Sequence, residues 1–365
     1  MSKPAVSPST ALLAHPPCSM GPDAYLHVAE ALRPHGKNAL LIGGKRALGA
    51  GGSLLRAALT GADVRLSVWP FSGEATLKAA QSAAEAARSL GAEVILGMGG
   101  GRAIDTAKAA AHLAGLPVMA FPTIPATCAG VTALAVLHQP GVEGYDPFLF
   151  LKGPPAHVFL HTGILAAAPP MYLRAGIGDS LAKHVESAFK AGGETLAFGD
   201  RLGLATAAFG YETLMEAGAQ ALEDARLCLD TPAFRLACEI CILNTGLVSL
   251  LVAERFNGGL AHALYYVLHE LPGFAPHLHG DVVAWGSLAQ LCLDGKAQKA
   301  QGLYRFLKSL GIPDSLSAFG MTADSPALMS RLPRVLAQPD MKEAPFPVDE
   351  AALQEALRQA EALAL

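Results

Sequence analysis

Short apolar runs alternate with alanine-rich segments along the first 140 residues, and no other feature of the sequence limits the possible folds so strongly. The apolar runs have the composition of buried strands, and they are Asn38–Gly43, Ala62–Val68, Ala92–Gly97 and Pro117–Phe121. Segments between them, such as Glu74–Leu90, carry apolar residues at helical spacing. Strands that alternate with helices predict an α/β domain, in which helices cover both faces of a parallel sheet.

The pattern changes after about residue 165, where strand-like runs become rare. Long helical stretches follow, at Tyr172–Ala191, Asp200–Ala217, Thr231–Arg255 and Gly259–Leu271. The paired prolines of Ala167–Pro170 end regular structure and are typical of a connector. We therefore predict an α/β nucleotide-binding domain over residues 1–164 and an all-helical domain over residues 165–365. The region Phe319–Leu365 is expected to add helices that pack on the second domain.

The composition excludes several classes of protein. Of the 365 residues, 52% are hydrophobic and 16% are charged, and the net charge is −4. So much apolar surface excludes intrinsic disorder, and the slightly acidic balance excludes a nucleic-acid binder that relies on bulk charge. No apolar stretch reaches the roughly 18 residues of a membrane span, and the N-terminus lacks the apolar core of a signal peptide. We expect no membrane association.

The six cysteines are scattered along the chain. This distribution fits free thiols in a reducing cytoplasm better than a disulfide framework. Cys238 and Cys241 form a C-x-x-C pair, but no glycine turn or second pair accompanies them. We interpret them as two cysteines on one face of a core helix.

Three consecutive glycines, Gly99, Gly100 and Gly101, stand between a predicted strand and a helix that starts near Arg102. Glycine lets the backbone turn sharply and approach a ligand, and a helix N-terminus directs free N–H groups at a phosphate. The pattern is neither G-x-G-x-x-G nor a Walker sequence, so a simple tight loop is the alternative. A second glycine-rich stretch, Gly43–Gly49, also follows a strand and is the weaker signal.

A carboxylate and two imidazoles in the second half form a candidate metal site. Asp179 lies near the start of a predicted helix, and His262 and His279 are 17 residues apart. Such a set with an open fourth position suits a catalytic divalent metal. Spacing alone leaves the alternative of histidines on helix faces or in loops, and it makes His277 as good a candidate as His279.

Four motifs in this order resemble one family. They are Gly99-Gly-Gly-x-x-x-Asp-Thr-Ala-Lys, Pro122-Thr-Ile-Pro-Ala-Thr, Gly176-Ile-Gly-Asp, and His262 with His279-Gly. Together they are similar to the iron-containing alcohol dehydrogenase and glycerol dehydrogenase superfamily, over about residues 35–290. The resemblance implies a dehydroquinate synthase-like fold, with an N-terminal dinucleotide-binding domain and an all-α C-terminal domain.

The resemblance also implies the site residues. The metal ligands would be Asp179, His262 and His279, with Zn²⁺ favoured over Fe²⁺. The cofactor contacts would be Gly99, Gly100, Gly101, Asp105, Thr123, Thr132, Leu134, Gly44, Lys45 and Arg46. The implied reaction is hydride transfer between NADP(H) or NAD(H) and a small-molecule substrate, whose oxygen the metal activates as a Lewis acid. Members of the family usually assemble, so a homo-oligomer is expected.

Two departures from the family pattern bear on the substrate. Cys128 stands where glycerol dehydrogenases place an Asp, so a contact to a polyol hydroxyl is missing. Lys183 follows Asp179 by four residues, on the same helix face. A lysine there is a poor metal ligand but a good counter-ion for an anionic substrate, and the alternative is a salt bridge to Glu186 or Asp179.

A third departure bears on the cofactor. The predicted strand end before Lys45 and Arg46 has no carboxylate for a ribose 2′-OH, and these two cations favour the 2′-phosphate of NADP(H). With these features the chain is most similar to the bacterial hydroxycarboxylate dehydrogenase subgroup. We therefore expect NADPH-linked reduction of a small 2-oxo carboxylate, with Lys183 as a catalytic-site residue that holds the carboxylate.

Other functions fit the same architecture. The main alternative is an NAD-dependent glycerol or other polyol dehydrogenase. Glycerol-1-phosphate dehydrogenase and dehydroquinate synthase share the fold, but the latter uses Glu where this chain has Asp179. A non-catalytic cofactor-binding homologue is the more remote alternative, and the intact set of ligand residues argues against it.

Overall fold

The structure is a computed structural model, and it describes residues 15–138 and 148–364. The N-terminal segment, for which no signal peptide is expected, lies mostly outside the described residues. The chain forms two compact units. His15–Ile177 with Glu216–Gly246 form the sheet unit, and Gly178–Met215 with residues 247–364 form the helical unit. The division between residues 164 and 165 stays a prediction.

A six-stranded parallel sheet forms the centre of the sheet unit, in the order β1-β8-β5-β4-β2-β3. Its strands are β1 (Cys18–Gly21), β2 (Asn38–Gly43), β3 (Arg65–Pro70), β4 (Val94–Gly99), β5 (Val118–Pro122) and β8 (His157–His161). The strands predicted from the apolar runs are therefore confirmed as β2 to β5; the bounds of β2 are as predicted, and the ends of the other three shift by one to three residues. The antiparallel pair β6 (Leu134–Val136) and β7 (Phe148–Phe150) forms a separate small sheet.

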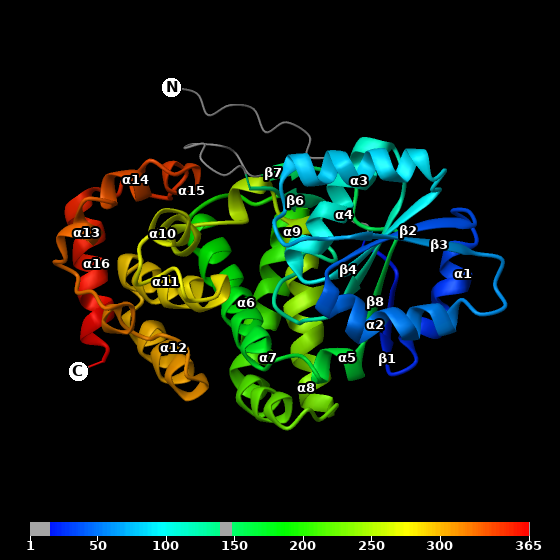
Figure 1. The fold of residues 1–365 in the computed structure, drawn as a ribbon. Helices are drawn as coiled ribbons and strands as arrows, with labels where there is room; N and C mark the ends of the chain where they lie inside the picture. The colour runs from blue at the N-terminus through cyan, green and yellow to red at the C-terminus, as the bar shows by residue number, and fades with distance from the viewer. Residues whose placement is uncertain (1–14, 139–147, 365) are drawn as a thin grey trace. The chain divides into compact units, whose positions relative to one another are not determined.

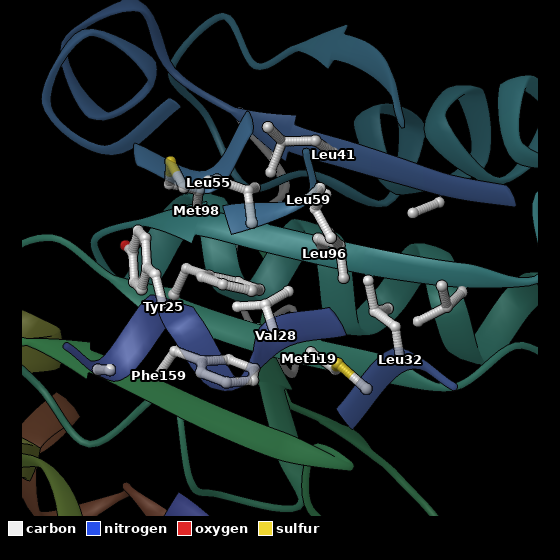
Figure 2. Packing of buried hydrophobic residues seen from close by; sticks show 14 of the residues in the cluster. Tyr25, Val28, Leu32, Leu41, Leu55, Leu59, Leu96, Met98, Met119 and Phe159 are labelled. Atoms are coloured by element: carbon white, nitrogen blue, oxygen red, sulfur yellow. The ribbon is translucent and has the colours of Figure 1, made fainter. Parts of the chain in front are cut away.

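Helices cover both faces of the six-stranded sheet, as the alternation predicts (Figure 1). They are α1 (Val28–Leu32), α2 (Lys45–Ala58), α3 (Leu77–Ser89), α4 (Gly101–Ala114) and α5 (Thr162–Ala166). Consecutive strand residues point to opposite faces. Leu41 packs with Val28 and Leu55 from α1 and α2 (Figure 2), whereas Leu40 packs with the alanines of α3 and α4. Both faces of the central strands β2, β4 and β5 are thus buried, which explains why these strands are almost wholly apolar.

The helical unit is built around α11 (His279–Leu293), which is buried along almost its whole length. The helix α11 packs against α10 (Leu260–Leu268), α12 (Ala297–Leu310) and α16 (Glu350–Ala362). The shorter helices of its C-terminal part are α13 (Pro326–Met329), α14 (Leu332–Leu336) and α15 (Pro339–Lys342). Trp285 of α11 is fully buried against Phe274 and Phe319. The helices expected after Phe319 are present.

Two long helices continue from one unit into the other. These are α6 (Met171–Lys190) and α7 (Phe198–Arg226). The sequence predicts both, although α7 extends nine residues past its expected end at Ala217.

The helix predicted at Thr231–Arg255 consists of three segments. It begins with α8 (Pro232–Glu239), capped by the Thr231 hydroxyl, which accepts a hydrogen bond from the Phe234 N–H. A π-helical turn (Ile240–Asn244) and α9 (Thr245–Leu251) follow. Cys238 and Cys241 lie in this stretch, and both are buried and outside any disulfide bond, as predicted.

The same stretch, Pro232–Leu251, is long and apolar enough to cross a membrane by length and composition alone. The stretch contains Arg235, Glu239 and Asn244, so it is not the uninterrupted apolar run of about 18 residues that the sequence was searched for. The mean hydropathy of its most apolar window is 1.6, and 56% of that window is buried inside the protein. Core helices of globular proteins meet the same criterion, so this one helix is weak evidence for a membrane span.

Candidate metal and cofactor sites

Three side chains of the kind that bind metal ions lie close together in the helical unit. Asp179 comes from α6, His262 from α10, and His279 is the first residue of α11. The Oδ1 atom of Asp179 is 3.7 Å from Nε2 of His262 and 3.4 Å from Nε2 of His279. All three candidate ligand atoms lie within 4.8 Å of one another. Residues separated by up to 100 positions in the sequence thus converge on one point.

A buried carboxylate fixes the ring of His262. Glu186, on α6, accepts a hydrogen bond from the backbone N–H of His262 at 2.8 Å. Its other oxygen lies 2.6 Å from Nδ1 of the same residue. A carboxylate oxygen accepts hydrogen bonds, so Nδ1 is the donor of this contact and Nε2 is the ring atom that faces Asp179. The sequence suggests Glu186 only as a salt-bridge partner of Lys183, so its contact with His262 was not predicted.

Glycines allow the helices that carry Asp179 and His279 to approach closely. A Cβ atom on Gly178 would lie 2.3 Å from the carbonyl oxygen of Gly280, far inside a van der Waals contact. Gly178 directly precedes Asp179 in α6, and Gly280 directly follows His279 in α11. Close approach at this crossing therefore brings the carboxylate and the imidazole together.

The charges in this cluster favour a cation. Burial by itself raises the pKa of Asp179, but the hydrogen bond and charge of His279, with the charges of His262 and Lys183, outweigh it and lower that pKa. Burial lowers the pKa of His262, but the adjacent Glu186 and Asp179 outweigh it and raise that pKa. Asp179 is consequently an ionised carboxylate at neutral pH.

The donor set fits a divalent transition metal. A tetrahedral zinc centre with bonds of about 2.1 Å separates its ligand atoms by about 3.4 Å. The separations measured from Asp179, 3.4 and 3.7 Å, are close to that value. One carboxylate and two imidazoles suit Zn²⁺ or Fe²⁺, and three protein ligands leave a position open for a substrate.

The structure distinguishes His279 from His277, which sequence spacing could not do. His277 precedes α11, and its ring packs on Phe319 with centroids 4.9 Å apart. His279, by contrast, lies edge-on against Tyr265 with ring centroids 4.2 Å apart. Among the described residues, only His279 joins Asp179 and His262 in a ligand cluster.

Lys183 is half-buried on α6. Its ammonium donates hydrogen bonds to the backbone oxygen of Asn257 at 2.8 Å and to the side-chain oxygen of Asn257 at 3.2 Å. Within the part of the chain that the structure describes, it forms no ion pair, so the alternative of a salt bridge to Glu186 or Asp179 is wrong. Two neutral oxygens of Asn257 therefore hold the ammonium in place.

The predicted cofactor loops lie at one edge of the sheet unit. In parallel register, Gly43 of β2 pairs with Met98 of β4, and Gly99 pairs with Pro122 of β5. The carboxyl ends of these strands therefore meet at the same edge. The chain order reverses between β2 and β4, since β3 lies beyond β2 and β5 lies beyond β4. In α/β sheets such a switch point is the usual place for a ligand.

The glycine turn has the conformation that its sequence predicts. Gly99 has a φ of +151°, Gly100 caps α4, and Gly101 is the first residue of that helix. A Cβ atom on Gly100 would lie 2.6 Å from Ile124, so the loop also packs closely on its neighbour. The free N–H groups of α4 point out of this turn, and no side chain caps them.

Other predicted cofactor residues lie around the same edge. Gly44 caps α2, and Lys45 and Arg46 are its first two residues, both exposed. Thr123 directly follows β5, and its backbone N–H donates to the carbonyl of Gly99. Gly99, Gly44 and Thr123 thus belong to adjacent strand ends.

Three further predicted cofactor residues surround Lys108, which was not itself predicted as a site residue. The ammonium of Lys108 is buried and lies 2.8 Å from Oδ1 of Asp105. It donates to the Thr132 hydroxyl at 3.1 Å and to the carbonyl oxygens of Ala129 and Leu134. Asp105, Thr132 and Leu134 thus share one internal partner. Lys108 is the last residue of the Asp-Thr-Ala-Lys motif described above, and that motif is the sequence signal by which it could have been found.

Comparisons with known proteins agree with this architecture. The model of the family "Iron-containing alcohol dehydrogenase" matches residues 16–147. A glycerol dehydrogenase from Escherichia coli O6:H1 is 34% identical, over 85% of this chain and 84% of its own length. Hydroxycarboxylate dehydrogenase A from Escherichia coli K12 is 34% identical over 66% of each chain. The crystal structure of a probable glycerol dehydrogenase from Sinorhizobium meliloti has a TM-score of 0.83 at 26% identity, covering 96% of this chain and 98% of that one.

A parallel sheet with an all-helical second part, and a carboxylate with two imidazoles in that part, define a metal-site dehydrogenase architecture. The chain belongs to the iron-containing alcohol dehydrogenase family. It is an NAD(P)-dependent dehydrogenase that acts on CH–OH groups, and glycerol dehydrogenases are prominent among its relatives.

Proposed function

We propose that this dehydrogenase is metal-dependent and transfers hydride between NADP(H) and a small 2-oxo or 2-hydroxy carboxylate. The single observation that carries the choice of substrate is the ammonium of Lys183, which forms no ion pair with any residue that the structure describes. It lies one helical turn after Asp179 on α6, and the oxygens of Asn257 hold it. A fixed cation beside the ligand cluster matches a substrate whose carboxylate lies next to its reacting carbon.

Asp179, His262 and His279 would hold the metal, with Zn²⁺ favoured over Fe²⁺. When bound, the ion supplies a Lewis acid and the nicotinamide supplies or takes the hydride. Asp179 would contribute an ionised carboxylate that balances the charge, and Glu186 would hold Nδ1 of His262 so that Nε2 faces the metal. Lys183 would bind and orient the substrate carboxylate, so that the carbonyl carbon is presented in one direction.

The cofactor would bind at the carboxyl edge of the sheet unit. The uncapped N–H groups of α4 behind Gly99 suit a pyrophosphate. Lys45 and Arg46, exposed at the start of α2, suit the 2′-phosphate of NADP(H). Cytoplasmic location and a homo-oligomeric state belong to the same proposal.

A substrate panel after zinc reconstitution tests the proposal. We expect the highest kcat/KM with 2-oxobutyrate and NADPH, measured against glycerol with NAD⁺ and against the uncharged analogue 1-hydroxy-2-butanone. Lys183→Ala should raise the KM for 2-oxobutyrate by about 10-fold or more, the loss expected for one charge-assisted hydrogen bond. The KM for 1-hydroxy-2-butanone should change little.

Two control variants sharpen this test. Lys183→Arg keeps the charge and should retain much of the preference for 2-oxobutyrate. Lys299→Ala is the negative control, because it removes a lysine from α12, a helix that carries no ligand. A KM for 2-oxobutyrate that Lys183→Ala leaves unchanged would contradict the assigned role.

An NAD-dependent glycerol dehydrogenase is the second candidate, because several similar relatives carry that name. Activity with glycerol and NAD⁺ well above that with 2-oxobutyrate and NADPH would favour it. Purified protein that contains no metal, binds none and is inactive on the whole panel would favour a non-catalytic homologue.

A further inference from the structure

The helix that carries His262 begins without a cap of its own. The residue before α10 is Gly259, which has no side chain to accept a hydrogen bond from the first N–H groups of the helix. This end of the helix is nevertheless buried, since Leu260 and Ala261 are fully inaccessible. Unsatisfied N–H groups at a buried helix end would destabilise the fold.

Two side chains from other helices cap α10 instead. Gln290, fully buried in α11, accepts hydrogen bonds from the N–H groups of Leu260 at 2.7 Å and Ala261 at 3.3 Å. Glu186, fully buried in α6, accepts from the next N–H group, that of His262. The first three N–H groups of α10 are thus satisfied in order by the two helices that carry the other ligands.

The same two side chains also join the helices to one another. Gln290 donates through Nε2 to the carbonyl oxygen of Val185, on α6, at 3.1 Å. Glu186 holds both the backbone and the ring of His262. A Cβ atom on Gly259 would lie 2.8 Å from Oε1 of Gln290 and 3.1 Å from Glu186, so glycine is needed for the two caps to reach the helix.

We infer that Glu186 and Gln290 are positioning residues that set the geometry of the metal site before any metal binds. Their hydrogen bonds fix α6, α10 and α11 relative to one another at the level of the ligands, and Glu186 fixes the His262 ring with Nδ1 as the donor and Nε2 toward the other ligands. This inference rests on the proposed metal function, but the tautomer and the helix cap are properties of the metal-free protein.

Glu186→Gln is the first test, because glutamine has one acceptor oxygen where two are used. We expect the dissociation constant for Zn²⁺, measured by chelator competition, to rise about 10- to 100-fold, as for other groups that orient metal-bound histidines. Gln290→Met removes the other cap, and it should speed amide hydrogen exchange at Leu260–Leu268 in the metal-free protein.

The matched control is Asp349→Ala, which removes the cap of α16, a helix that carries no ligand. It should lower the melting temperature without changing the dissociation constant for Zn²⁺. The inference is overturned if the Glu186→Gln protein has a lower melting temperature but binds Zn²⁺ as tightly as the wild type, because the role of Glu186 would then be structural only.

The ring proton of His262 can be observed without any change at Glu186. In ¹⁵N NMR spectra of the metal-free wild type, with His262→Asn used to assign the signal, Nδ1 should carry a proton. A ring protonated on Nε2 alone overturns the inference even if Glu186→Gln fails to fold. If the wild type binds no Zn²⁺, the proposed function fails, and the tautomer then decides the inference independently.

Discussion

At the scale of single residues, the sheet unit depends on a charge that it buries. The Lys108 ammonium is completely inaccessible and is surrounded by Asp105, the Thr132 hydroxyl and backbone carbonyls. Burial raises the pKa of Asp105, and the charge of Lys108 and the Val136 N–H oppose that rise only in part. Removing one member of such a group destabilises the protein, because the interior does not solvate the charge that is left unpaired.

Lys108→Met should therefore lower the free energy of unfolding by about 3 kcal/mol or more, since it leaves Asp105 and several carbonyl oxygens without their donor. Adding Asp105→Asn to that variant should recover part of the loss. Urea unfolding of the wild type, both single variants and the double variant measures this coupling. If the effects of the two substitutions simply add, the pair is not coupled.

At the scale of helices and strands, glycine contacts decide where ligand-bearing helices meet. Gly178 of α6 faces Gly280 of α11 beside two of the three ligands. In the same way, a Cβ atom on Gly286 of α11 would lie 2.9 Å from Ala261 of α10, next to the third ligand. These helices are thus held at a separation that larger residues would not permit.

Gly178→Ala should destabilise the protein by about 1–3 kcal/mol, because the new methyl group meets backbone that must move. It should also weaken Zn²⁺ binding, since α6 and α11 separate beside Asp179 and His279. The matched control is Gly302→Ala, inside α12, where an added Cβ meets nothing within 4 Å. That variant should instead gain up to about 1 kcal/mol from helix propensity. Thermal melts and chelator competition on both proteins compare them directly, and a neutral Gly178→Ala would contradict the packing argument.

At the scale of the whole molecule, the two candidate binding regions belong to different compact units. The ligand cluster lies in the helical unit, and the glycine turn lies in the sheet unit. A ligand that binds only the folded state stabilises the part of the chain that holds it.

Removal of metal should consequently act on the helical unit first. At a Zn²⁺ concentration 100 times its dissociation constant, binding adds about 2.7 kcal/mol to the stability of the folded state. Hydrogen exchange with and without chelator should show the largest change in residues 178–215 and 247–364, and NADPH should protect residues 99–106 of the sheet unit instead. Equal changes in both units on chelation would argue against a metal site confined to the helical unit.

Much of the fold could be predicted because local sequence patterns follow from buried surfaces. The central strands β2, β4 and β5 are almost wholly apolar since both of their faces are covered, and that pattern is visible without a structure. The ends of long helices were less predictable, as α7 shows, because contacts rather than propensity determine where a helix stops. The short strands β1, β6, β7 and β8 were not predicted, and of these β1 and β8 pair with each other although they lie far apart in the sequence.

The sequence by itself determined the α/β and helical parts, the glycine turn and the set of ligand candidates, because periodicity, glycine and ligand chemistry are local properties. Only the tertiary structure decided between His277 and His279, excluded a salt bridge to Lys183, and revealed Glu186, Gln290 and Lys108 as internal partners. The physical reason is that a hydrogen bond between buried groups depends on distance and direction in space. Glu186 and His262 are 76 residues apart in the sequence, and their two helices acquire that geometry only by packing.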